Sequence, residues 1–294
     1  MAAGQPINQE LGLSEVISKT FELYRRNFTK YFVVSLIVNT ISGIVTFLAL
    51  GHLVLSGPPA NPTPQQASDY LTSVVGPFIS YLLLIVLLSI ILSALAEGIM
   101  VIMASDDIKS GHVDLSSSVR FGGSKLLSIM ALQILLSILV GLGFILIVPG
   151  IILAIMFCLS MPALLIEGAG VTGSFGRSRE LVSHRWLKTF ATFLVLGLII
   201  AAIVVVSLLI GLAFGTAAVL VSGIIGSVYG PLLPIALTVY YYSNVARVSS
   251  AQVVQASFPT VPGVQPGLKY CSNCGTRMPA AAVYCPNCGI RTVP

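Results

Sequence analysis

The chain has 294 residues, of which 56% are hydrophobic and only 9% carry a charge. Soluble domains contain about a quarter charged residues, so this composition excludes a single water-soluble core. The formal net charge of +5 does not by itself indicate nucleic-acid binding, because Lys and Arg accumulate in the cytoplasmic loops of membrane proteins whatever their function.

An amphipathic segment, residues 11–30, precedes the first apolar run. Its apolar residues recur at spacings of three, four and seven, which indicates one apolar helical face with the basic residues largely off it. We expect this helix to lie in the cytoplasmic headgroup region. Residues 1–10 lack the features of a cleavable signal peptide, so the first apolar run is expected to act as a signal anchor.

Six apolar segments follow that can cross a bilayer, each as a helix of about 20 residues. Residues 187–246 hold two of them, although their length alone would also allow three. Prolines and glycines interrupt the later spans, and such breaks are tolerated where neighbours satisfy the freed backbone groups. The expected spans cover residues 31–55, 80–104, 126–147, 151–166, 187–213 and 220–246.

The basic residues provide an internal check on topology. With six spans and a cytoplasmic N-terminus, all fifteen Lys and Arg residues fall on the inner side, whereas a seventh span would place the C-terminal cysteines outside. We therefore predict an all-α integral membrane bundle in the cell membrane. It has about six transmembrane helices, cytoplasmic interfacial helices and both termini in the cytoplasm.

The chain also repeats one plan three times. Residues 13–31, 115–129 and 171–190 each predict a weakly amphipathic, basic helix, and each is followed by an apolar hairpin. We interpret this as a threefold repeat of one unit, in which a collar helix at the cytoplasmic surface leads into two membrane segments.

The C-terminal segment carries two Cys-x-x-Cys pairs. Cys271 and Cys274 form the first, Cys285 and Cys288 form the second, and each pair is followed by a glycine. Four thiolates around one ion make a closed tetrahedral zinc site with no open position for a substrate. The alternative is two disulfides, which a cytosolic location disfavours. So short a segment has too little core to fold unaided, and zinc binding would supply the folding energy.

We therefore expect a small β-rich zinc ribbon that holds one structural zinc ion. It resembles the minimal zinc-ribbon modules at the ends of many prokaryotic proteins, and that resemblance implies a binding role. The uncharged, proline-containing stretch before it is typical of a linker. The expected domains are a polytopic transmembrane domain (1–247), a flexible linker (248–268) and the zinc-ribbon domain (269–294).

The membrane region shows a resemblance of its own. Residues 11–246 resemble the membrane domain attached to some glycerophosphoryl diester phosphodiesterases, and related stand-alone proteins. The phosphodiesterase activity is not implied, because it belongs to a separate soluble barrel and no segment here is long or polar enough to form one. We predict no enzymatic activity. The matching residues are Pro149-Gly150-Ile151, Pro162, Glu167-Gly168, Ser178, Leu181 and Arg185-Trp186, with a weaker match at Leu13 and residues 21–28.

Glu97 is the candidate intramembrane polar site. It precedes Asp106 by nine residues, which places it roughly 13 Å inside the end of its span at the helical rise per residue. A carboxyl group at that depth is by default a functional candidate. The alternative is a neutral or hydrogen-bonded glutamate that faces the bundle.

Two functions remain open. The first is a non-enzymatic scaffold or adaptor, whose bundle anchors the ribbon for a cytoplasmic protein partner while the basic helices contact the lipid bilayer. Nucleic acid is disfavoured as a partner, because three basic residues without a basic–aromatic surface are weak evidence for it. The second is a transporter or channel-like protein for a small molecule or lipid, with Glu97 and the broken helices along its path.

The predicted topology can be tested with single cysteines. In intact cells, a membrane-impermeant maleimide should label Pro62→Cys, in the expected outer loop, and should not label Ser116→Cys, in an expected cytoplasmic segment. The unsubstituted chain serves as the background control. Labelling of Ser116→Cys from outside would contradict the assignment.

Overall fold

The structure, a computed structural model, is described here for all but a few short segments. The first compact unit extends from Leu11 to Tyr241, and the second contains the ribbon. The expected outer loop around position 62 and residues 257–267 of the expected linker lie outside the described residues. Those described are 6–55, 63–213, 218–256, 268–279 and 282–292.

Within the described residues, six helical segments are long and apolar enough to cross a membrane, which confirms the predicted number. In four of them no more than 22% of the most apolar stretch is buried, whereas the buried share is 50% in Val148–Ile166 and 44% in Val221–Ser250. Exposed apolar surface of this kind is compatible with a multi-pass protein in a lipid bilayer. The six segments are Phe28–Thr46, Tyr81–Ser110, Leu126–Phe144, Val148–Ile166, Trp186–Gly211 and Val221–Ser250.

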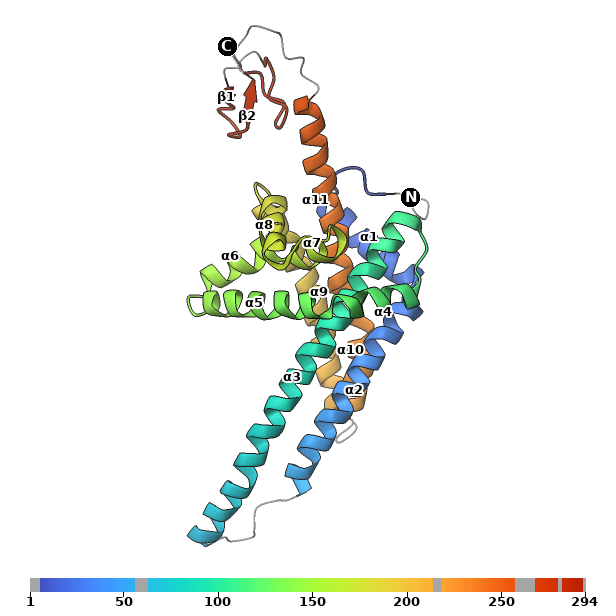
Figure 1. The fold of residues 1–294 in the computed structure, drawn as a ribbon, viewed down its shortest axis with the longest axis vertical. Helices are drawn as coiled ribbons and strands as arrows, with labels where there is room; N and C mark the ends of the chain where they lie inside the picture. Colours follow the sequence, from blue (N-terminus) through green and yellow to red (C-terminus); the bar gives the residue numbers. More distant parts are fainter. Residues whose placement is uncertain (1–5, 56–62, 214–217, 257–267, 280–281, 293–294) are drawn as a thin grey trace. The chain divides into compact units, whose positions relative to one another are not determined.

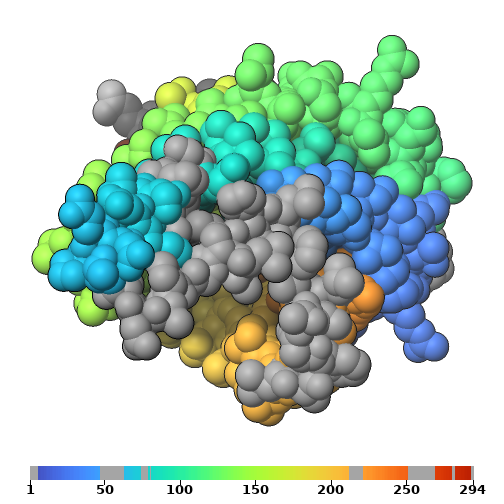
Figure 2. Space-filling view, turned by 90° about the horizontal axis from the view of Figure 1, so that it is seen from below, coloured from blue at the N-terminus to red at the C-terminus, as the bar shows by residue number. Residues whose placement is uncertain are grey.

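Three short helices each lead into a helical hairpin, as the sequence repeat predicts (Figure 1). Helix α5 packs beside α6, α2 packs beside α3 and α10, and part of α10 reaches the same face of the unit as the ends of α2 and α3 (Figure 2). The three repeats are α1 (Leu13–Arg26) with α2 (Phe28–Leu55) and α3 (Pro64–Ser110); α4 (Leu115–Ser124) with α5 (Leu126–Phe144), α6 (Val148–Phe157) and α7 (Ser160–Ile166); and α8 (Val171–Val182) with α9 (Trp186–Ala213), α10 (Ala218–Tyr229) and α11 (Leu232–Ala256).

Helix α11 corrects one expectation about the linker. It continues to Ala256, so residues 248–256, which we expected to be flexible, are helical. The first proline after the last span is Pro259, three positions beyond the end of α11. No helix-breaking residue therefore stops α11 where the apolar span ends.

The fourth span is a broken helix, and a serine from α8 satisfies the backbone at the break. Helix α6 ends at Phe157 and α7 begins at Ser160. The hydroxyl of Ser178 donates to Met156 O at 2.8 Å and accepts from Leu159 N at 3.1 Å. An unpaired backbone group inside a bilayer costs several kcal/mol, so Ser178 stabilises the interruption.

The last span is broken in the same way between α10 and α11. Pro231 has no backbone N–H to continue the helix. From α1, the hydroxyl of Tyr24 donates to Val228 O at 2.5 Å. Burial raises the pKa of Tyr24 to about 12, so this hydroxyl keeps its proton at neutral pH. Tyr24 of α1 thus hydrogen-bonds a backbone group at the break in the last span, as Ser178 of α8 does at the break in the fourth span.

Ion pairs hold the same short helices in place. Arg26 Nη2 donates to Asp107 Oδ1 at 2.5 Å, and the Asp107 side chain is fully buried. At the end of α7, Glu167 accepts hydrogen bonds of 2.9–3.0 Å from Nε and Nη2 of Arg177 in α8. Burial alone would raise the pKa of Glu167, but the hydrogen bonds from Arg177 and Tyr241 and the charge of Arg177 outweigh it and lower that pKa. These charges therefore have a structural role.

The tight turn between α5 and α6 explains the Pro149-Gly150 motif. A Cβ atom on Gly150 would lie 2.6 Å from the backbone N of Phe144, which is closer than real Cβ contacts come. A side chain at position 150 would therefore force the two helices apart.

A pair of serine substitutions in α8 tests the role of Ser178. Ser178→Ala should lower the free energy of unfolding by about 1–3 kcal/mol, because it leaves a buried donor and a buried acceptor unpaired. Ser174→Ala is the matched control: Ser174 is equally buried, but its hydroxyl donates only to Val171 O within its own helix. Thermal unfolding in detergent would measure both, and equal losses would contradict the assigned role.

Candidate functional site

The four terminal cysteines lie on two turns of the ribbon. In the first, strands β1 (Leu268–Tyr270) and β2 (Arg277–Pro279) pair antiparallel, with Tyr270 opposite Arg277. In the second, an isolated bridge joins Tyr284 to Arg291. Each turn therefore carries one Cys-x-x-Cys pair between a tyrosine and an arginine.

The two turns have the same backbone geometry. Cys271 O accepts from Gly275 N and Cys285 O accepts from Gly289 N, both at 2.9 Å. Both glycines adopt φ values near +70°, a left-handed conformation that strongly favours glycine. The sequence therefore folds each pair of thiols toward one side of its turn.

The sulfur positions fit one tetrahedral ion and not disulfides. Cys271 Sγ lies 3.6 Å from Cys288 Sγ, and Cys274 Sγ lies 3.5 Å from Cys285 Sγ. A disulfide would bring two sulfurs to about 2.05 Å, whereas four sulfurs at ~2.3 Å from zinc are about 3.8 Å apart. All four ligand atoms lie within 4.8 Å of one another. The ribbon thus gathers a closed four-thiolate site for one metal ion.

Neighbouring groups favour thiolates at two of these cysteines. Side-chain and backbone hydrogen bonding with Thr276 lowers the pKa of Cys274 to about 6. Thr276 Oγ1 accepts from Cys274 Sγ at 3.2 Å and from Asn287 Nδ2 at 2.9 Å. The backbone amide of Ile290 lowers the pKa of Cys288. Such outer contacts orient metal ligands and tune their basicity.

The core of the ribbon consists mainly of the ligands themselves. Cys271, Met278 and Cys285 are its buried members, and Cys274, Ala282 and Cys288 pack against them. So small a cluster cannot supply the stability of a folded domain. The geometry therefore fits a metal that supplies folding energy, with the protein's own thiolates completing its coordination.

Sequence reasoning missed an exact duplication around the cysteines. The pattern Tyr-Cys-x-Asn-Cys-Gly-x-Arg occurs at residues 270–277 and again at 284–291. The two tyrosines are 68% and 61% exposed, and both arginines are exposed as well. Residues directly opposite on one face of a strand pair are neighbours. The ribbon therefore presents two similar Tyr–Arg pairs, a feature that comparing the two motifs would have revealed.

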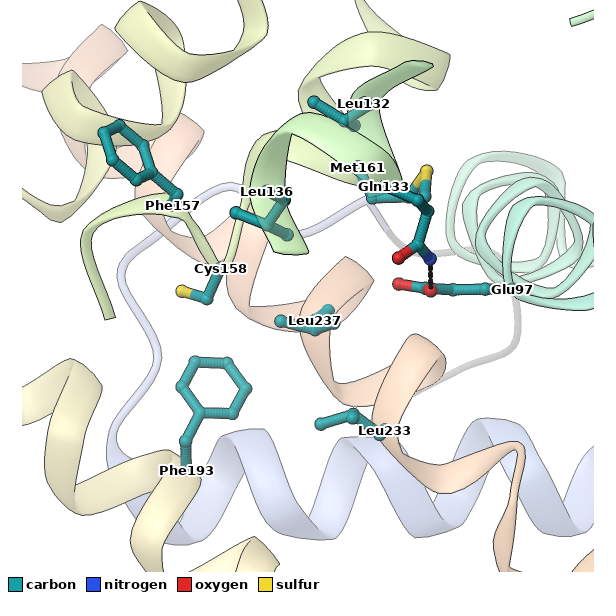
Figure 3. A pocket seen from close by; sticks show the side chains of 10 residues that line it. All are labelled: Glu97, Leu132, Gln133, Leu136, Phe157, Cys158, Met161, Phe193, Leu233 and Leu237. Atoms are coloured by element: carbon teal, nitrogen blue, oxygen red, sulfur yellow. Dashed lines mark hydrogen bonds between the residues drawn. The ribbon is translucent and has the colours of Figure 1, made fainter. Parts of the chain in front are cut away.

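Glu97 lies in a cavity of the membrane unit, far along the chain from the cysteines. Gln133 Nε2 of α5 donates to Glu97 Oε2 of α3 at 2.5 Å (Figure 3). Gln133 was not singled out from the sequence, although it is the one amide side chain in Leu126–Phe144, whose other polar side chains are serines. We call this cavity the Glu97 pocket. It has a volume of about 250 Å³ and is lined by Glu97, Leu132, Gln133, Leu136, Phe157, Cys158, Met161, Phe193, Leu233 and Leu237.

Comparison with known proteins assigns a family to the ribbon alone. Residues 270–291 match the family described as a zinc-ribbon domain. No curated protein and no solved structure matches the chain. The zinc-ribbon prediction is confirmed for this segment. The resemblance of the membrane region to the phosphodiesterase-associated membrane domain has no support from these comparisons.

We expect the purified protein to contain about one zinc ion per chain, because four thiolates complete the preferred coordination of zinc. Cys274→Ser should reduce the zinc content to near zero, whereas Cys158→Ser should leave it unchanged. Elemental analysis of the intact protein measures both. Wild-type protein without zinc, or with all four terminal cysteines oxidised, would contradict the assignment.

Proposed function

We propose that the protein is a non-enzymatic membrane adaptor, in which the helical bundle anchors the zinc ribbon and the ribbon binds a cytoplasmic protein. The observation that carries this proposal is the closed four-thiolate site beneath two exposed Tyr–Arg pairs. All four coordination positions of the metal are filled by protein. The metal therefore has no position left for a ligand, and any binding by the ribbon would use its surface side chains.

That surface has the composition of a protein-binding site. Tyr and Arg are enriched among the residues that dominate binding energy at interfaces. Val283 and Ile290 add exposed apolar area, 53% and 42% exposed respectively. The segment from Leu268 to Thr292 contains no acidic residue, so a partner with apolar and acidic groups would complement it.

A protein suits this surface better than nucleic acid, but the reason differs from the one expected from the sequence. The two Tyr–Arg pairs are a small basic–aromatic surface, which the sequence reasoning took to be lacking. Charge is the better criterion. Lys269, Arg277 and Arg291 supply three positive charges, while four thiolates around one Zn²⁺ supply two negative ones. The ribbon's net charge is thus about +1, which would attract a polyanion such as a nucleic acid only weakly.

The membrane part of the proposal concerns orientation and lipid contact. The chain is placed in the cell membrane with both termini and the ribbon in the cytoplasm, supported by the distribution of its basic residues. Basic residues near α1, α4 and α8 would then meet anionic headgroups. The architecture of the phosphodiesterase-associated membrane domain is proposed for this bundle without the phosphodiesterase activity.

Transport is the second candidate, and the Glu97 pocket is the observation that favours it. Discontinuous helices with an ionisable group between them are typical of transporter binding sites. Both broken spans contribute to the pocket, through Met161 of α7 and Leu233 of α11. In this alternative the membrane unit would carry out transport, and the ribbon would be an accessory domain.

Ribbon-specific substitutions test the adaptor function. A partner crosslinked through the ribbon in cells, once identified, should bind the full-length protein about tenfold or more weakly after Tyr284→Ser, because truncating an interface tyrosine commonly costs more than 1 kcal/mol. Ser272→Ala is the matched control, since Ser272 is an exposed ribbon residue outside the Tyr–Arg pairs. Zinc content must be unchanged in both variants. A nucleic acid recovered as the crosslinked partner would contradict the proposal.

Two further variants separate the adaptor from the transporter. Deleting residues 248–294 should abolish the cellular role of an adaptor and spare that of a transporter, whereas Glu97→Gln should do the reverse. Complementation of a deletion strain provides the common readout.

A further inference from the structure

The Glu97 pocket combines one acidic group with an apolar wall and lacks a basic counterpart. None of the residues that line it is Lys, Arg or His. The nearest lysines in sequence on either side of Glu97 are Lys30 and Lys109, each close to an end of its span. An ionised carboxylate in such surroundings is costly unless it is paired. No residue that lines the pocket balances the charge of an ionised Glu97, so a proton or a bound cation would neutralise it.

The polar end of the pocket offers two acceptor oxygens. Gln133 uses its Nε2 to donate to Glu97 Oε2. Glu97 Oε1 and Gln133 Oε1 lie side by side and point into the cavity from α3 and α5 (Figure 3). An ammonium group has three N–H donors and no acceptor. It can therefore donate to both oxygens while its charge pairs with the carboxylate.

The rest of the pocket accommodates a hydrocarbon group. Phe157, Phe193 and four leucines form most of its wall. Its volume of about 250 Å³ is far more than one water molecule needs, so it has room for a small organic group. The ligand that fits both ends is thus small, apolar along most of its length and cationic at one end.

We propose that the Glu97 pocket binds a lipophilic ammonium compound, with its charged nitrogen between Glu97 and Gln133 and its alkyl or aromatic group against Phe157 and Phe193. The proposal does not rest on the adaptor function of the ribbon. It would also define the class of molecule handled in the transport alternative.

Three ligands of equal chain length test this assignment: octylamine, octanol and octanoate. Each is titrated against the full-length protein in neutral detergent, and bound ligand is counted by native mass spectrometry. Octylamine should bind at about tenfold lower concentration than octanol, since one charge pair in the pocket need contribute only about 1.4 kcal/mol to produce that ratio. Octanoate should bind more weakly than octanol, because its charge repels Glu97.

Matched variants locate the site. Glu97→Gln should remove the advantage of octylamine and leave octanol binding unchanged. Asp69→Asn is the control: Asp69 lies on the same helix, is exposed, and its replacement changes the net charge equally. Gln133→Leu supplies an independent variant and should weaken octylamine several-fold through the loss of one acceptor.

Three results would overturn the proposal. One is equal binding of the three ligands to the wild-type protein. Another is an octylamine preference that survives in Glu97→Gln. The third is wild-type protein that binds no octylamine. The first and third use only the wild-type protein. The proposal can therefore still be refuted if the Glu97→Gln variant misfolds. None of these results bears on partner binding by the ribbon.

Discussion

Backbone hydrogen bonding inside the bilayer is the constraint on which the membrane unit depends. Helices satisfy their own backbone groups, so a broken span needs partners from elsewhere. Ser178 supplies them at the break between α6 and α7, and Tyr24 supplies one at the break before α11. Both side chains come from short amphipathic helices. These helices therefore do more than cover the bundle at the membrane surface, because they complete the hydrogen bonding of broken spans: α8 acts on the span that directly precedes it, and α1 acts on the last span, at the other end of the unit's sequence.

The sequence was sufficient for features that depend on local composition and spacing. The six spans follow from apolar length, and the metal site follows from two Cys-x-x-Cys pairs with their glycines. It was insufficient where two distant residues meet. The contact between Gln133 and Glu97 joins two helices, and the partners of Ser178 lie about twenty positions away. The end of α11 was missed for another reason: small polar residues before a proline-containing stretch predicted a linker, but a polar segment without a helix breaker can stay helical.

The two candidate sites differ in chemistry and in completeness. The ribbon gathers four thiols that together satisfy one metal ion, so its local polar groups are complete and its outer surface is left for recognition. In the Glu97 pocket the polar groups are not all balanced, because an acid and an amide meet there and no basic residue lines the pocket. The pair of Glu167 and Arg177 provides the contrast within one molecule: there the acid has its base, and the result is a structural link between α7 and α8.

The duplicated turn of the ribbon has a consequence for stoichiometry. Tyr270 with Arg277 and Tyr284 with Arg291 are two copies of one chemical surface on a single module. Under the proposed adaptor function, a ligand group that recognises one copy would meet a second within the same small domain, which would give the ribbon a valency of two. A partner that itself carries a repeated motif would engage both copies at once, and the second contact would form at a high effective concentration. A partner with a single motif would have two alternative places to dock.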